Sequence, residues 1–145
     1  MEIRAFKEDD GKRCQQIARS SFDYSHVLDL SASHIIVAAE EGGVVGFGYI
    51  HIWQWNKVAW LGDLVVEDRH RGRGIGTKLI QHLAKLAKND GCITLMDHPP
   101  SNHPVIGFYL KLGFRFCGYN DSYFNNPRNR MAVFMCLDIH KELTE

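Results

Sequence analysis

Residues 60–77 read Trp-Leu-Gly-Asp-Leu-Val-Val-Glu-Asp-Arg-His-Arg-Gly-Arg-Gly-Ile-Gly-Thr, and they are the most informative part of the chain. The apolar run at 60–66 predicts a buried strand, and the amphipathic segment at 78–88 predicts a helix. A glycine-rich turn between a strand and a helix gathers unpaired N–H groups at the positive end of the helix dipole, which suits phosphate oxygens. We therefore predict a pyrophosphate-binding loop made of Arg71, Gly72, Arg73, Gly74, Ile75, Gly76 and Thr77.

The spacing of the glycines narrows the choice of phosphate ligand. A Walker A loop has six residues from first to last glycine and then Lys, whereas here the span 72–76 is shorter and Thr77 precedes Lys78. The dinucleotide pattern G-x-G-x-x-G is also not met, because the chain offers G-x-G-x-G. Residues 71–76 do satisfy Arg/Gln-x-x-Gly-x-Gly/Ala, and so resemble the coenzyme A loop of the GNAT superfamily of N-acetyltransferases. A glycine turn that binds nothing is the alternative.

A second motif, residues 102–114, resembles the other signature of that superfamily. It places Asn102 seven residues before Tyr109, which is followed by Lys-Leu-Gly-Phe. Physically the segment predicts a short helix, with Pro104 near its start and Gly113 at its end. Tyr109 on such a helix is either a core residue or a catalytic one. The two motifs stand in the expected order, and the resemblance covers roughly residues 44–137.

The resemblance implies a fold, a donor and several roles. It implies a mixed, mostly antiparallel α/β sheet with helices on both faces, in which two neighbouring parallel strands splay apart to bind acetyl-coenzyme A. The main-chain groups of Leu64, Val65 and Val66 would then contact the pantetheine arm, and Asn102 would contact it from the facing loop. Tyr109 would be the acid that protonates the coenzyme A sulfur.

Composition agrees with one enzyme domain over residues 1–145. The chain is 45% hydrophobic and 23% charged, and its formal net charge is zero, so no general nucleic-acid or membrane partner is expected. No membrane span or signal peptide is recognisable, and the four cysteines are widely separated, which favours a reduced, cytoplasmic protein. We expect a monomer or a homodimer, and the sequence does not choose between them. The eight histidines lack zinc-ligand spacing, so we expect no metal.

The periodicity predicts one alternating order of elements around a mixed sheet. Strands are expected at 2–6, 34–40, 44–53, 57–66, 92–97, 114–124 and 131–139. Helices are expected at 7–22, 76–89 and within the second motif, with the stripe Leu79, Leu83 and Leu86 buried.

Two carboxylates are candidate bases for removing the proton of an acceptor amine. Asp97 ends a predicted strand, five residues before Asn102, and Asp63 interrupts the apolar strand before the glycine loop. A carboxylate in an apolar strand needs partners or a raised pKa. A purely structural role, as a cap or a hydrogen-bond acceptor, is the alternative for both residues.

The acceptor is expected in an aromatic groove, because aromatic faces and carboxylates suit a cationic amine. We predict Phe22, Tyr24, Trp53 and Tyr123 as substrate-binding residues, and the wider set of candidates adds His26, Trp55, Tyr119 and Phe124. Residues 116–137 resemble the streptothricin acetyltransferase-like members of the superfamily, although Gly62 departs from the Glu common there. The predicted reaction is transfer of the acetyl group to a small cationic primary amine by direct attack in a ternary complex. The alternatives are a protein N-terminal or lysine acetyltransferase, and a non-catalytic acyl-coenzyme A sensor.

Overall fold

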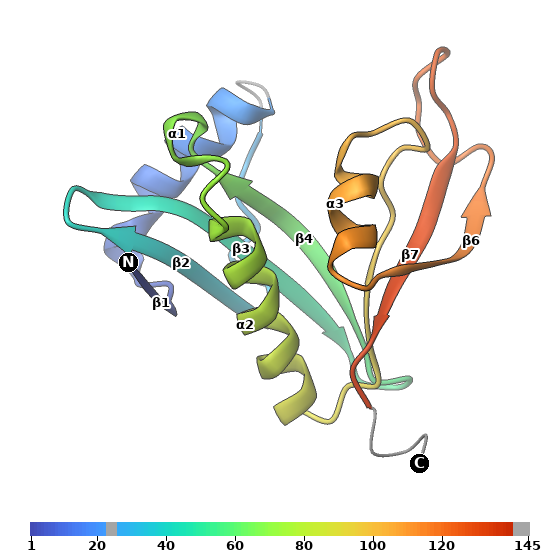
Figure 1. The fold of residues 1–145 in the computed structure, drawn as a ribbon, viewed down its shortest axis with the longest axis horizontal. Helices are drawn as coiled ribbons and strands as arrows, with labels where there is room; N and C mark the ends of the chain where they lie inside the picture. Colours follow the sequence, from blue (N-terminus) through green and yellow to red (C-terminus); the bar gives the residue numbers. More distant parts are fainter. Residues whose placement is uncertain (23–25, 141–145) are drawn as a thin grey trace.

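A computed structural model describes residues 1–22 and 26–140, which are organised around a seven-stranded sheet of order β1-β2-β3-β4-β5-β7-β6 (Figure 1). All neighbouring strands are antiparallel except β4 and β5, which run parallel. The strands are β1 (Glu2–Ala5), β2 (His34–Glu40), β3 (Gly43–Trp53), β4 (Val58–Val66), β5 (Thr94–Asp97), β6 (Arg115–Asn120) and β7 (Ala132–Asp138). This architecture confirms the predicted mixed, mostly antiparallel sheet.

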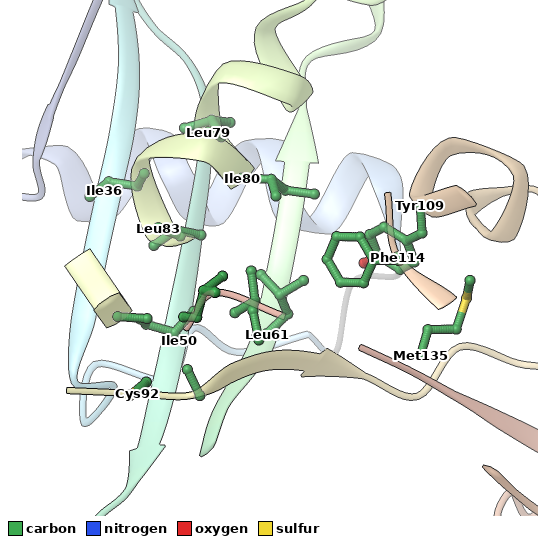
Figure 2. Packing of buried hydrophobic residues seen from close by; sticks show 14 of the residues in the cluster. Ile36, Ile50, Leu61, Leu79, Ile80, Leu83, Cys92, Tyr109, Phe114 and Met135 are labelled. Atoms are coloured by element: carbon green, nitrogen blue, oxygen red, sulfur yellow. The ribbon is translucent and has the colours of Figure 1, made fainter. Parts of the chain in front are cut away.

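Helices cover both faces of the sheet, as predicted. Alternation along β2 sends Ile36 into a core beneath α2 (Ile75–Asn89) and Val37 into a second core beneath α1 (Gly11–Ser21). Figure 2 shows the first core, where Leu79 and Leu83 of α2 lie over the strands. The predicted burial is complete for these two leucines but only partial for Leu86, because Ala87 occupies the buried position at that end of the helix.

Two predicted element boundaries were wrong. The strand expected at 114–124 ends at Asn120, whose Oδ1 accepts a hydrogen bond from the N–H of Ser122 at 3.0 Å and turns the chain. The helix expected from residue 7 begins instead with a 3-10 turn, Glu8–Asp10, because the carboxylate of Asp10 accepts the N–H of Lys7 at 2.8 Å. No helix of the described residues is long and apolar enough to cross a membrane.

The parallel strands β4 and β5 pair over a short length and then separate. Their register joins residues 58–60 to residues 94–96, after which β4 continues beside β3 as far as Val66. The separation begins next to a bulge, where Gly62 and Asp63 of β4 together face Tyr49 of β3. A Cβ atom on Gly62 would lie 2.6 Å from the Tyr49 ring, so glycine alone fits there. Figure 1 shows β4 diverging from the half of the sheet that carries β7 and α3 (Val105–Lys111).

Candidate functional site

A pocket of about 760 Å³ lies where β4 has separated from β5. Its lining comes from the end of β4, the glycine loop with the start of α2, α3 with the loop before it, and the end of α1. Its lining residues are Ser21, Phe22, Leu64, Val65, Val66, His70, Arg71, Gly72, Gly74, Ile75, Gly76, Thr77, His103, Pro104, Val105 and Phe108. We call it the first pocket. Its polar loop and its apolar walls match the two halves of an acyl-coenzyme A, a pyrophosphate and a pantetheine arm.

The glycine loop is shaped by left-handed backbone at Gly72 (φ +77°) and at Gly74 (φ +79°). These angles strain any residue with a side chain, and no heavy atom lies within 4 Å of where either Cβ would be, so the space before the loop is open. Gly74 is the residue that precedes α2, so the first-turn N–H groups of that helix face this space. At Gly76 a Cβ would lie 3.4 Å from Phe108 of α3, which places the two helices in close contact. The loop therefore fits a pyrophosphate.

The two arginines of the loop differ in their placement. Arg71 lines the first pocket, and its guanidinium donates to the carbonyl of Val66 at 3.0 Å and pairs with Asp68 at 3.1 Å. Arg73 was also predicted to face the phosphates, but it pairs with Glu40 of β2 at 2.8 Å. Among the described residues that line the first pocket, Arg73 does not appear.

A second pocket, of about 650 Å³, adjoins the first along β4. Residues 60–63 of β4 line the second pocket, and residues 64–66 line the first. Its lining consists of four large aromatic side chains, two histidines, two carboxylates and two further strand residues: Trp53, Trp60, Tyr123, Phe134, His51, His98, Asp63, Asp97, Leu61 and Gly62. An aromatic cavity with two carboxylates has the chemistry to hold an ammonium group.

Tyr109 and Asp97, both predicted to be catalytic, are hydrogen-bonded to each other. The Tyr109 hydroxyl donates to Asp97 Oδ2, and the N–H of His98 donates to Oδ1 at 2.7 Å. Burial raises the pKa of Asp97 despite these bonds, and burial with the nearby Asp97 charge raises the pKa of Tyr109. Tyr109 is therefore a neutral proton donor. It is 2% exposed and stacks on Phe114 in the core, and within the described chain it lines neither pocket.

Asp63, the other predicted base, has two partners from different elements. Its Oδ2 lies 2.6 Å from Nε2 of His26, in the loop after α1. Burial, and then the charge and hydrogen bond of Asp63, raises the pKa of Tyr49 on β3, so the phenol stays protonated. Asp63, whose carboxylate was predicted to need partners within an apolar strand, thus has His26 and Tyr49 as partners.

The remaining predicted residues are dispersed. Trp53 and Tyr123 line the second pocket, whereas Phe22 lines the first and Tyr24 lies outside the described residues. Asn102 is exposed, and its Oδ1 accepts the amide of Asn129 at 2.6 Å; neither pocket includes it among the described lining residues.

Sequence reasoning missed several lining residues of the second pocket. Trp60 lies on the strand already recognised, three residues before Asp63, and could have been included from that strand alone. His98 and Phe134 gave no local signal, because β5 and β7 become neighbours only in the folded sheet. Of the wider candidates, Trp55 and Tyr119 are largely exposed, at 82% and 68%.

Comparison with known proteins finds relatives that are named as acetyltransferases. The sequence profile of the acetyltransferase (GNAT) family matches residues 3–114. The chain is 27% identical over 138 residues to a streptothricin acetyltransferase of Streptomyces lavendulae, covering 93% of this chain and 69% of that protein. It is 25% identical over 146 residues to a putative ribosomal protein bS18-alanine N-acetyltransferase of Bacillus subtilis (strain 168), covering 94% and 95%. The fold is similar to that of an aminoglycoside 6'-N-acetyltransferase complexed with coenzyme A, with a TM-score of 0.81 at 20% identity, covering 96% and 97%.

Proposed function

Because this chain belongs to the acetyltransferase (GNAT) family, we propose that it transfers an acetyl group to the primary amine of a small cationic acceptor. The donor is acetyl-coenzyme A, as the resemblance implied, and the chain is an acetyl-coenzyme A-dependent acetyltransferase. The proposal concerns the acceptor and the mode of reaction, which is direct attack of the amine on the bound thioester in a ternary complex.

The observation that carries this proposal is the second pocket. Trp53, Trp60 and Tyr123 supply aromatic faces, and Asp63 and Asp97 supply carboxylates within one cavity of about 650 Å³. A cation over an aromatic face gains about 0.5–2 kcal/mol, depending on how far it is desolvated. A cavity of this size suits a small molecule. Its position beside the first pocket would bring the acceptor amine to the thioester end of the donor.

The first pocket supports the proposal that acetyl-coenzyme A is bound beside the acceptor in a ternary complex. Main-chain groups of 64–66 no longer pair with β5, and they can bind an extended pantetheine arm. Arg71 and the first turn of α2 can hold the pyrophosphate. Tyr109 keeps its predicted role as the acid for the departing thiolate. That role requires its hydroxyl to leave Asp97 for the sulfur.

A peptide amine is the second candidate acceptor. The Bacillus subtilis relative, named for a ribosomal protein, aligns over nearly its whole length with this chain. A peptide needs an open groove along the sheet end, whereas the second pocket is lined by Trp53 at the end of β3 and by Tyr123 in the loop between β6 and β7. The aromatic lining favours the small amine.

A mixed acceptor screen tests the proposal. Purified protein is incubated with acetyl-coenzyme A and a panel of amino-sugar antibiotics, polyamines and short peptides, and products are read by mass spectrometry. We expect acetylation of one or more small amines. We also expect Trp60→Leu to lower that acetylation more than it lowers binding of acetyl-coenzyme A. Robust acetylation of peptides, with none of the small amines modified, would overturn the choice of acceptor.

A further inference from the structure

We propose that the imidazole of His26 is the base that removes the proton from the acceptor amine, and that Asp63 orients and supports that imidazole. This assignment rests on the proposed function to the extent that the acceptor is an amine that arrives protonated. It differs from the sequence prediction, in which a carboxylate was the base. It adds a residue from the loop after α1 to the site.

His26 is not among the described residues that line either pocket, but it contacts one lining residue of each. Its Nε2 lies 2.6 Å from Oδ2 of Asp63, which lines the second pocket. Its ring centroid lies 4.6 Å from that of Phe22, which lines the first pocket. The amine has to meet the thioester where the two pockets adjoin. The side chains of His26 and Asp63 are 24% and 14% exposed, so the pair is sheltered but still reachable by a ligand.

Helix α1 holds the backbone of His26 in place. The side-chain amide of Gln15 donates to the His26 carbonyl at 2.7 Å, while its Oε1 accepts the N–H of Leu28 at 3.1 Å. Arg19 adds a longer contact to the same carbonyl, at 3.5 Å. These contacts hold the backbone from the His26 carbonyl to Leu28 against α1 and so help to fix the imidazole against Asp63, which is the kind of support that a catalytic base requires.

The two predicted carboxylate bases are already occupied as hydrogen-bond acceptors. The Asp63 carboxylate accepts hydrogen bonds from the His26 imidazole and the Tyr49 hydroxyl. The Asp97 carboxylate accepts hydrogen bonds from the Tyr109 hydroxyl and the backbone N–H of His98. A carboxylate that already accepts two hydrogen bonds has fewer free lone pairs with which to take a proton from the amine, and it orients its two donors. When Nε2–H of the imidazole donates to Asp63, Nδ1 keeps the lone pair that can accept a proton. This is the same division of labour as in a carboxylate–histidine–nucleophile triad.

The charged and titratable groups around the imidazole come from α1, β3, β4 and the segment before β2. Asp63 of β4 faces it directly, and Tyr49 of β3 reaches the same carboxylate. Arg19 of α1 touches its backbone carbonyl. Beyond Tyr49, His51 contacts the tyrosine ring with centroids 5.6 Å apart and pairs with Asp29 at 3.0 Å. The carboxylate beside the ring stabilises the imidazolium that forms when the proton arrives.

The proposed step balances as follows. An acceptor R–NH3⁺ gives one proton to Nδ1 of His26, which leaves a neutral amine and an imidazolium paired with Asp63. The amine nitrogen forms a bond to the acetyl carbon, the carbon–sulfur bond breaks, and the sulfur leaves with its electron pair. The Tyr109 hydroxyl gives its proton to the sulfur, which becomes the thiol, and a second proton from the nitrogen restores the hydroxyl. The imidazolium releases the first proton to solvent, so the net products are amide, thiol and one proton.

The test uses the full chain and the acceptor that the mixed screen acetylates best. His26→Gln keeps a side-chain amide that can still donate to Asp63 but cannot act as a base. We expect kcat/KM to fall by about 10²–10⁴-fold, with unchanged affinity for acetyl-coenzyme A. The acidic limb of the pH–rate profile should disappear, and added imidazole should restore part of the activity of His26→Ala. His34→Gln is the matched control, because His34 Nε2 also lies 2.6 Å from an aspartate, Asp90, but neither residue lines a described pocket.

Two results would overturn the assignment. One is a His26→Gln protein whose rate stays within about threefold of the wild type and whose pH–rate profile keeps its acidic limb. The other needs no acceptor: in nuclear magnetic resonance spectra, Asp63→Asn should change the His26 Nε2–H signal and leave that of His34 unchanged. A His26 signal that does not respond would show that the pair does not exist in solution. If the wild type acetylates only peptides, the proposed acceptor fails, while the same kinetics with a peptide still decide the role of His26.

Discussion

Replacing Tyr109 by Phe removes one oxygen atom and tests the centre of the site in two ways. The ring can keep its buried position and its stacking on Phe114, because the change removes only the hydroxyl. Asp97 loses one of the two donors that hold its carboxylate and keeps only the N–H of His98. The variant should therefore fold, with a measurable loss of stability and a larger loss of turnover.

The size of the stability loss follows from the burial of the acceptor. A hydrogen bond to a charged group contributes about 1.5–3 kcal/mol. For a chain of this length each kcal/mol moves Tm by about 2–4 °C, so we expect Tm to fall by about 3–12 °C at neutral pH. If the hydroxyl also protonates the departing thiolate, kcat should fall by about 10²–10⁴-fold while acetyl-coenzyme A affinity stays nearly unchanged.

The stability loss should depend on pH in a defined direction. Burial raises the pKa of Asp97 above its ordinary value of 3.8, and the Tyr109 hydrogen bond opposes that rise. A carboxyl group with a raised pKa in the folded protein stabilises the fold when protonated, and this stabilisation is lost as pH rises through the folded pKa. Without the hydroxyl the pKa of Asp97 rises further. The stability deficit of Tyr109→Phe should thus be larger at neutral pH than in acid, where Asp97 is protonated in both proteins.

The measurements are thermal unfolding across pH, titration calorimetry with acetyl-coenzyme A, and thiol release with the best acceptor. Tyr119→Phe is the matched control, because it removes a phenol that is 68% exposed. Equal Tm deficits at acid and neutral pH would refute the reasoning about Asp97. An unchanged kcat in a folded Tyr109→Phe protein would refute the role of Tyr109 as the acid.

Three further predictions concern the two pockets and the fold. Gly76→Val should weaken acetyl-coenzyme A binding at least about fivefold by calorimetry, because its Cβ would already lie 3.4 Å from Phe108 and its methyl groups would enter the first pocket; unchanged affinity in the folded variant would contradict the phosphate site. Trp60→Leu should raise KM for a cationic acceptor about 2- to 30-fold, and an equal rise for a neutral acceptor would argue against a cation–π contact. Asp10→Asn should destabilise the fold by about 1.5–3 kcal/mol in denaturant titrations, because both oxygens of the carboxylate bind Arg4, at 2.8 and 3.0 Å. Arg4 lowers the pKa of Asp10, so this stability is present above the ordinary value of 3.8 and is lost as pH falls through the folded pKa; a deficit that persisted in strong acid would disprove the ionic origin.

The parts of the fold that the sequence predicted are those with local signals. The strand, the glycine loop and α2 follow one another without interruption, so hydrophobic periodicity and glycine positions were sufficient to place them. The choice of partner for a long polar side chain is not local. Arg73 was predicted to face phosphates but pairs with Glu40, and this contact exists only because β2 lies near the loop in the folded protein.

Hydrophobic periodicity also could not predict the order of the last strands in the sheet. β7 inserts between β5 and β6, so Phe134 and His98 come to line one pocket although they are far apart in the chain. His26 and Asp63 are 37 residues apart, and neither position predicts the other. Aromatic residues could be named as candidates from their type, but which of them enclose a pocket depended on this strand order.

The bulge in β4 explains how one strand can place leucines in the hydrophobic core and a carboxylate in the candidate site. In a regular strand, Leu61 and Asp63 would share a face, since side chains alternate with a period of two. Instead Leu61 and Leu64, three residues apart, both pack in the core beneath α2, so the extra residue frees Asp63 from the apolar face. Gly62 is needed for this because the Tyr49 ring occupies the place of its side chain. The bulge that brings the Asp63 carboxylate to His26 also lies where β4 separates from β5. The second pocket, proposed for the acceptor, and the first pocket, proposed for acetyl-coenzyme A, therefore adjoin at this bulge.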